Sequence, residues 1–122
     1  MTVRLVFCLK RLETLTQEEF LAYWHDVHAP LVRERSAALR IARYEQAHPV
    51  PGDPAGLIAR LRAAPEPYDG VASLWFGSLE DFQAGGSTPE GRQAAKELLE
   101  DERRFIDLAN SPIWLATDRG IF

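Results

Sequence analysis

The sequence predicts an α+β fold of the ferredoxin-like type, a four-stranded antiparallel sheet with helices on one face. Strand-like and helix-like segments follow one another in the order βαββαβ, which is the split βαβ arrangement. The chain of 122 residues is long enough for one hydrophobic core, and it shows no internal repeat or linker. We therefore predict a single domain over residues 1–122.

The four strands are predicted from runs of apolar and β-branched residues. The first strand covers residues 3–9, where Val3, Leu5, Phe7 and Leu9 alternate with the intervening residues. The second and third are expected at residues 40–47 and 68–76, and the last at residues 111–118.

The helices are predicted from their start signals. Thr16 and Glu19 form a T-x-x-E capping box that opens the first helix. Thr88-Pro89-Glu90 opens a second long helix, which is expected to run to about residue 108, after a short helical stretch that Gly85-Gly86 ends. Five of the eight prolines lie in residues 49–67, which predicts a long excursion with a short helix at 55–62.

Composition narrows the classes of function. The formal charge of −4 gives no basic footprint for nucleic acid. A single cysteine, Cys8, allows no internal disulfide. No apolar run approaches the roughly 18 residues of a membrane span, and the N-terminus lacks the pattern of a signal peptide. We therefore expect a cytoplasmic protein without nucleic-acid or membrane partners.

Apolar residues on both sides of two strands predict an oligomer. The first strand carries Leu5 and Phe7 on one side and Val6 and Cys8 on the other, and the third strand is apolar on both sides too. Two helices can cover only one face of the sheet, so the other would expose an apolar patch of several hundred Å², which is large for a monomer. We therefore predict a homodimer in which the sheet faces pack together.

The first helix contains the unusual segment YWHDVHAPLV, residues 23–32. At about 100° per residue, the stripe expected to face the sheet is Phe20, Trp24, Val27 and Leu31. His28 lies on the flank of this stripe, with His25 further round and Tyr23 on the wetter side. Pro30 cannot donate a hydrogen bond to the carbonyl of Asp26, so a kink or break is predicted beside His28.

The second long helix carries a carboxylate within its apolar stripe, which consists of Ala95, Leu98, Phe105, Ile106 and Ala109. Glu102 projects into the middle of this stripe, and Asp101 lies at its edge. A buried carboxylate without a partner costs several kcal/mol. We therefore expect Glu102 to form an ion pair, with His28 as the first candidate and His25 or Arg4 as alternatives, and we assign Asp101 and Pro30 structural or ion-pairing roles beside it.

Three segments closely resemble the EthD family: FLAYWHDVHAPLV at 20–32, YDGVASLWFGSLEDF at 68–82 and DERRFIDLANSPIWLATD at 101–118. They follow the family's order and span nearly the whole chain, and Trp24, His28 and Pro30 form its W-x-x-x-H-x-P core. The resemblance implies a protomer that pairs into a dimeric α/β barrel, with a cavity between sheet and helices. The proline-rich insertion before Tyr68 departs from the family and is a possible lid over that cavity.

The resemblance also implies a range of functions. Family members are associated with degradation of ethyl tert-butyl ether beside a cytochrome P450 system, and similar folds serve as cofactor-free cyclases, dehydratases and small monooxygenases. The favoured function is therefore a cofactor-independent enzyme of one of these types, acting on a small apolar or aromatic substrate. Two alternatives stay open: a non-catalytic protein that binds a small apolar compound or supports an oxygenase, and a haem-binding relative.

His28 is the predicted catalytic residue, since an imidazole with a pKa near ~6.5 can accept or donate a proton at neutral pH. The alternative is a structural histidine that bonds a backbone carbonyl freed by Pro30, or Glu102. The residues predicted to bind substrate are Trp24, His25, Tyr68, Trp75, Phe76 and Phe105; the alternatives are core packing for the tryptophans and phenylalanines, turn chemistry around Tyr68 and solvation for His25. No metal site or cofactor is expected, since His25 and His28 are three residues apart and no H-E-x-x-H motif or cysteine cluster is present.

Overall fold

A computed structural model describes all residues 1–122 and confirms the ferredoxin-like α+β fold. The four strands are β1 (Val3–Leu9), β2 (Arg43–Ala47), β3 (Gly70–Phe76) and β4 (Ile113–Ala116). They form one antiparallel sheet in the order β2-β3-β1-β4. The second, third and fourth strands are shorter than the sequence predicted, and the first is as predicted.

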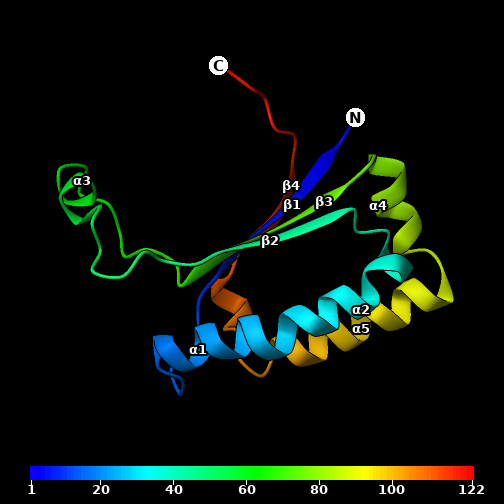
Figure 1. Cartoon of the computed structure of the whole chain (residues 1–122), viewed down its shortest axis with the longest axis horizontal. Helices are drawn as coiled ribbons and strands as arrows, with labels where there is room; N and C mark the ends of the chain where they lie inside the picture. The colour runs from blue at the N-terminus through cyan, green and yellow to red at the C-terminus, as the bar shows by residue number, and fades with distance from the viewer.

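The helices that precede β2 and those that follow β3 lie on one side of this sheet (Figure 1). The first helical segment consists of α1 (Gln17–Tyr23), a π-helical turn η1 (Trp24–His28) and α2 (Ala29–Leu39), and α5 (Pro89–Glu102) packs beside α2. A short helix, α4 (Leu79–Gly85), connects β3 to α5. The predicted capping box opens α1, since the Thr16 side chain accepts from the Glu19 backbone and the Glu19 side chain accepts from the Thr16 backbone.

The strand register fixes which side chains face the helices. Leu5 pairs with Leu74, and Phe7 pairs with Ala72, so these alternate positions point to the helical side, which we call the inner face. The opposite, outer face has no helix packed against it in Figure 1. Its apolar residues are Val6, Cys8, Val71, Trp75 and Trp114.

The π-helical turn corrects the predicted stripe of the first helix. The buried residues are Phe20, Trp24, His28 and Val32, whereas Val27 is 49% exposed. The amide of Ala29 donates to the carbonyl of Trp24 five residues earlier, so one extra residue enters the turn and rotates the buried face from Val27 to His28. The helix does not break at Pro30, since α2 continues through it, but the π-helical turn that ends at His28 interrupts the regular α-helix beside that residue.

The second long helix ends at Glu102, about six residues earlier than predicted. Beyond it the backbone turns back to the segment after β1. The carbonyl of Phe105 accepts from the amide of Leu12, and the amide of Asp107 donates to the carbonyl of Lys10. Phe105 and Ile106 are therefore buried as predicted, but they lie outside the helix. A 3₁₀ turn, η2 (Leu108–Asn110), then leads to β4.

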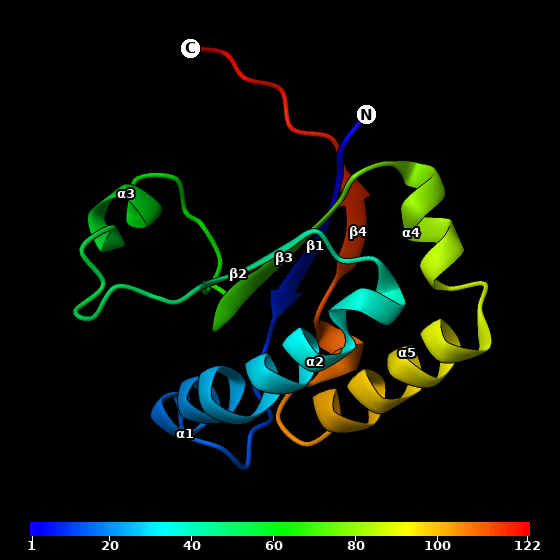
Figure 2. The same ribbon diagram turned by 45° about the vertical axis from the view of Figure 1, so that its right-hand side comes forward.

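The proline-rich excursion between β2 and β3 projects away from the body of the molecule and carries the short helix α3 (Gly56–Arg60) (Figures 1 and 2). Several apolar side chains on it are exposed, namely Val50, Leu57, Ile58 and Leu61. None of its residues lines the cavity described below. The excursion is therefore not a lid over the cavity of its own chain, which corrects that expectation.

Candidate active site between the sheet and the helices

A cavity of about 550 Å³ lies between the inner face of the sheet and the helices. Sites that bind drug-sized ligands have volumes of about 300–1,000 Å³, so this cavity has room for a small molecule. Twenty-one residues line it, and sixteen of them are hydrophobic. No arginine or lysine is among them. The cavity is therefore mainly apolar, with a few polar groups.

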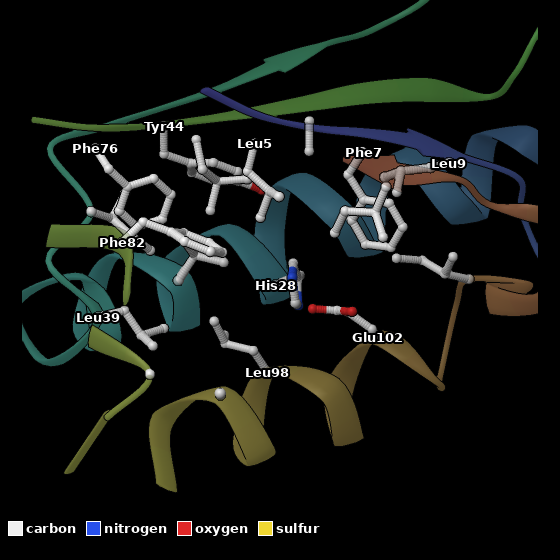
Figure 3. Close-up of a pocket in the computed structure, with 18 of the residues that line it drawn as sticks. Leu5, Phe7, Leu9, His28, Leu39, Tyr44, Phe76, Phe82, Leu98 and Glu102 are labelled. Carbon is white, nitrogen blue, oxygen red and sulfur yellow. The ribbon is translucent and has the colours of Figure 1, made fainter. Parts of the chain in front are cut away.

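His28 and Glu102 lie together in the cavity, away from Phe76 and Phe82, and we call the region around these two polar side chains its polar end. In Figure 3, Leu39, Phe76 and Phe82 lie at one end, His28 and Glu102 lie nearer the middle, and the apolar Phe7 and Leu9 lie beyond them. The rings of Phe76 and Phe82 meet edge to face with their centroids 5.0 Å apart. A ligand with an apolar body and one polar end matches this arrangement.

Three side chains from two helices form a hydrogen-bonded chain at the polar end. The Nδ1 atom of His28 lies 2.7 Å from Oδ2 of Asp101. The hydroxyl of Tyr23 donates to the other oxygen of Asp101 at 2.5 Å. The ring of Phe105, which is fully buried, packs against the His28 ring with the centroids 5.0 Å apart. These contacts hold the imidazole in one orientation.

The environment of His28 sets its protonation state. Burial lowers its pKa below the usual value, and the nearby Asp101 opposes this shift without cancelling it. The imidazole is therefore neutral at neutral pH. Because a carboxylate can only accept, Nδ1 carries the proton that bonds Asp101. The Nε2 atom then has a free lone pair, as a general base requires.

Glu102 lies beside this pair, with its carboxyl group directed into the cavity and toward the His28 ring (Figure 3). Burial, and to a lesser degree the charge of Asp101, raise the pKa of Glu102 to about 7. The predicted Glu102–His28 ion pair is wrong, because the carboxylate that bonds His28 is Asp101. The end of α5 presents Asp101 to the first helix and Glu102 to the cavity, so the two adjacent carboxyl groups have different environments.

The predicted substrate-binding residues divide into two groups. Trp24 and Phe76 line the cavity, so their role in binding remains a prediction. The other four do not line it. Trp75 points to the outer face and stacks with the guanidinium of Arg43; Phe105 is sealed behind His28; Tyr68 lies at the base of the excursion; and His25 is exposed and bonds Asp26.

Several lining residues were missed by sequence reasoning. Tyr44 faces the cavity opposite Leu74 in the sheet, and its hydroxyl accepts from the side chain of Gln46 at 2.9 Å. Its alternation with Arg43 and Glu45 could have identified it. Leu39 and Phe82 had no such signal, since their position depends on how α2 and α4 pack.

Two further observations concern ligands and membranes. No group of three or more histidine, cysteine, aspartate or glutamate side chains is arranged to hold a metal ion. No helix has the length and apolar character needed to cross a membrane.

Comparison with known proteins shows which family the chain is similar to. The model of the EthD domain matches residues 12–109. An EthD family protein from Bacillus halodurans has a similar structure, with a TM-score of 0.65 and 17% identity over 98% of this chain and 100% of that one. No curated protein matches in sequence.

Two other solved structures are similar at lower identity. A dimeric ferredoxin-like protein of unknown function from Thermobifida fusca has a TM-score of 0.59 and 14% identity over 97% of this chain and 92% of that one. SnoaB, a cofactor-independent oxygenase from Streptomyces nogalater, has a TM-score of 0.57 and 15% identity over 98% of this chain and 94% of that one. At these sequence identities, the structural similarity shows a shared fold and nothing more.

Proposed function

We propose that this chain, which belongs to the EthD family, is a cofactor-independent enzyme that acts on a small, mainly apolar molecule in the cavity. His28 is the general base, and the reaction is of the cyclase, dehydratase or monooxygenase type. The observation that carries this proposal is the Asp101–His28 pair at the polar end of an otherwise apolar cavity.

The geometry explains how His28 performs this role. Asp101 holds the proton on Nδ1 and stabilises the imidazolium that forms when Nε2 takes a proton from the substrate. Tyr23 fixes Asp101 from the other side. The apolar walls, formed in part by Trp24 and Phe76, hold a flat or aliphatic body by burial alone. The similarity to a cofactor-independent oxygenase is consistent with this use of the fold.

A variant of His28 tests this function and separates it from simple binding. A library of hydroxylated and ketone-bearing naphthalenes is incubated with the protein, and products are followed by mass spectrometry. We expect His28→Ala to lower turnover by about 10²–10⁴-fold, which is the usual contribution of a general base, with ligand affinity retained. His25→Ala is the matched control, because His25 is exposed and outside the cavity.

The outcome of this experiment decides between enzyme and binding protein. If ligands bind to the native protein but no compound is converted, the alternative of a binding or accessory protein in an oxygenase system replaces the catalytic proposal. If compounds are converted equally well by His28→Ala, the base is another residue.

We also propose a homodimer through the outer faces of two sheets. The outer face carries the half-exposed Trp114 next to Val6, and Trp75 and Val71 on the neighbouring strand. A structurally similar protein is described as dimeric. Light scattering at micromolar concentration should give twice the mass of the chain, and a mass of one chain would contradict the proposal.

A further inference from the structure

The proposed mechanism leaves one group at the polar end without a role. Glu102 lines the cavity beside His28, and its side chain forms no hydrogen bond or ion pair within the protein. Burying an unpaired carboxyl group destabilises a protein. An apolar residue of similar size at this position would complete the wall without that cost. The position of this carboxyl group therefore indicates a chemical use.

We propose that Glu102 is the acid that acts together with His28 in proton transfer on an uncharged carbonyl compound. This inference rests on the proposed function of the same cavity and adds a second catalytic residue and a substrate class. Glu102 is suited to this role because the group must be protonated before the reaction, and its pKa of about 7 keeps a large fraction protonated at neutral pH.

The two groups perform complementary halves of one step. The Nε2 atom of His28 takes a proton from the carbon next to the carbonyl, and the carboxylic acid of Glu102 gives its proton to the carbonyl oxygen. The C–H and the acid O–H bonds break, an N–H and an enol O–H bond form, and the carbon–oxygen π bond becomes a carbon–carbon π bond. Electrons are conserved, so the step needs no oxidant or reductant.

The products of this step stabilise each other. The reaction leaves His28 as an imidazolium and Glu102 as a carboxylate, with Asp101 on the other side of the ring. Opposite charges attract strongly in a poorly solvated site. Return of the two protons resets both groups, and return to a different carbon of the ligand isomerises it.

The charges around the cavity define the class of substrate. Glu102 lines it and Asp101 lies behind the His28 ring, and no arginine or lysine lines it. Tyr44, from β2, is the other titratable group that lines it. A ligand carboxylate or phosphate would enter this site without a cation to pair with and would meet a negative charge. The structure therefore favours an uncharged ketone over its acidic analogues.

Two matched ketones test the inference. 2-Acetyl-6-methylnaphthalene and 6-acetyl-2-naphthoate share the acetyl group and the rings, and differ in a methyl group against a carboxylate. Exchange of the acetyl protons for deuterium in heavy water is followed by NMR. We expect the native protein to accelerate exchange of the uncharged ketone and to leave the carboxylate at its spontaneous rate.

Substitutions of Glu102 complete the test. Glu102→Gln should lower the exchange rate by about 100-fold or more, and Glu102→Asp should retain part of it. Binding of the uncharged ketone, measured by calorimetry, should persist in both variants and shows that they are folded. Glu100→Gln is the matched control, because this exposed glutamate lies on the same helix outside the cavity.

Each result has one meaning. Exchange that requires His28 but is unchanged in Glu102→Gln overturns this inference and leaves the proposed function standing. Faster exchange of the carboxylate than of the methyl compound overturns the substrate class. No acceleration by the native protein, although the ketone binds, overturns the acid–base pair together with catalysis by His28 on ketones.

Discussion

The two faces of the sheet are built from the same strands but have different surroundings. On the inner face, Phe76 and its neighbours meet the helices and the apolar cavity. On the outer face, Trp75 lies 4.3 Å from the guanidinium of Arg43, and Arg4 bonds Asp118 nearby. Adjacent residues of β3 therefore serve different purposes: one closes the candidate active site, and the other lies on the surface proposed to bind a second copy.

The largest expected effect is the loss of stability caused by a charged substitution on the inner face. Phe76→Asp would place a charge among buried side chains, and we expect a loss of about 4 kcal/mol or more in the free energy of unfolding. Trp75→Asp is the matched substitution on the outer face. There the fold should persist and the dimer should dissociate. Urea denaturation measures the first effect, and light scattering measures the second.

These two variants can contradict the distinction between the faces. If Trp75→Asp unfolds the chain as strongly as Phe76→Asp, the outer face is part of the protomer core. If Trp75→Asp leaves the mass of a dimer unchanged, the second copy binds elsewhere.

Alternation along the strands made this division of faces predictable. The alternation of Val3, Leu5 and Phe7 with Val6 and Cys8 separated the two sides of β1, and the apolar residues on both sides indicated that the face without helices needs a cover. The structure shows that Leu5 and Phe7 are on the inner side. The fold class followed from local signals such as the Thr16 capping box. Each of these signals lies within a few neighbouring residues, so the sequence alone could reveal them.

The details of the site depended on longer-range geometry. The predicted stripe placed Val27 inward, because it assumed a regular helix, whereas the π-helical turn buries His28 instead. Similarly, Glu102 was expected to bond His28, but Asp101 does so. These two carboxyl groups are adjacent, and their roles depend on how the last turn of α5 packs against the first helix, which no local pattern specifies.

A second prediction compares the carboxyl groups on the two faces. Burial raises the pKa of Glu102 to about 7, whereas the bond with Arg4 lowers the pKa of Asp118 on the outer face. Folding therefore favours the protonated form of Glu102, and the stability that this group contributes is lost as the pH rises from about 4.5 through about 7. The free energy of unfolding of Glu102→Gln minus that of the native protein should therefore increase by about 2 kcal/mol as the pH rises from 5 to 8.

The measurement is urea denaturation of both proteins at the two pH values. The lowered pKa of His28 acts in both proteins with the opposite sign, because protonation of the unfolded chain favours unfolding as the pH falls below about 6.5. It therefore cancels in the comparison. Asp118→Asn should show no such dependence between pH 5 and pH 8, since its stabilising effect is lost only at lower pH. A difference between Glu102→Gln and the native protein that stays constant with pH would contradict the environment described for Glu102.

The smallest expected effect concerns Tyr23, whose hydroxyl bonds Asp101 but which does not line the cavity. Tyr23→Phe removes one hydrogen bond, worth about 1 kcal/mol, that orients Asp101 and, through it, the His28 ring. Because this orientation is loosened, kcat should fall by about tenfold or less with KM unchanged. Without this donor, Asp101 would stabilise the imidazolium more strongly, and the acidic limb of the pH profile should move to higher pH. Tyr68→Phe is the control, since Tyr68 is 44% exposed at the base of the excursion. A rise in KM with the same kcat would mean that Tyr23 acts on ligand binding rather than on the orientation of His28.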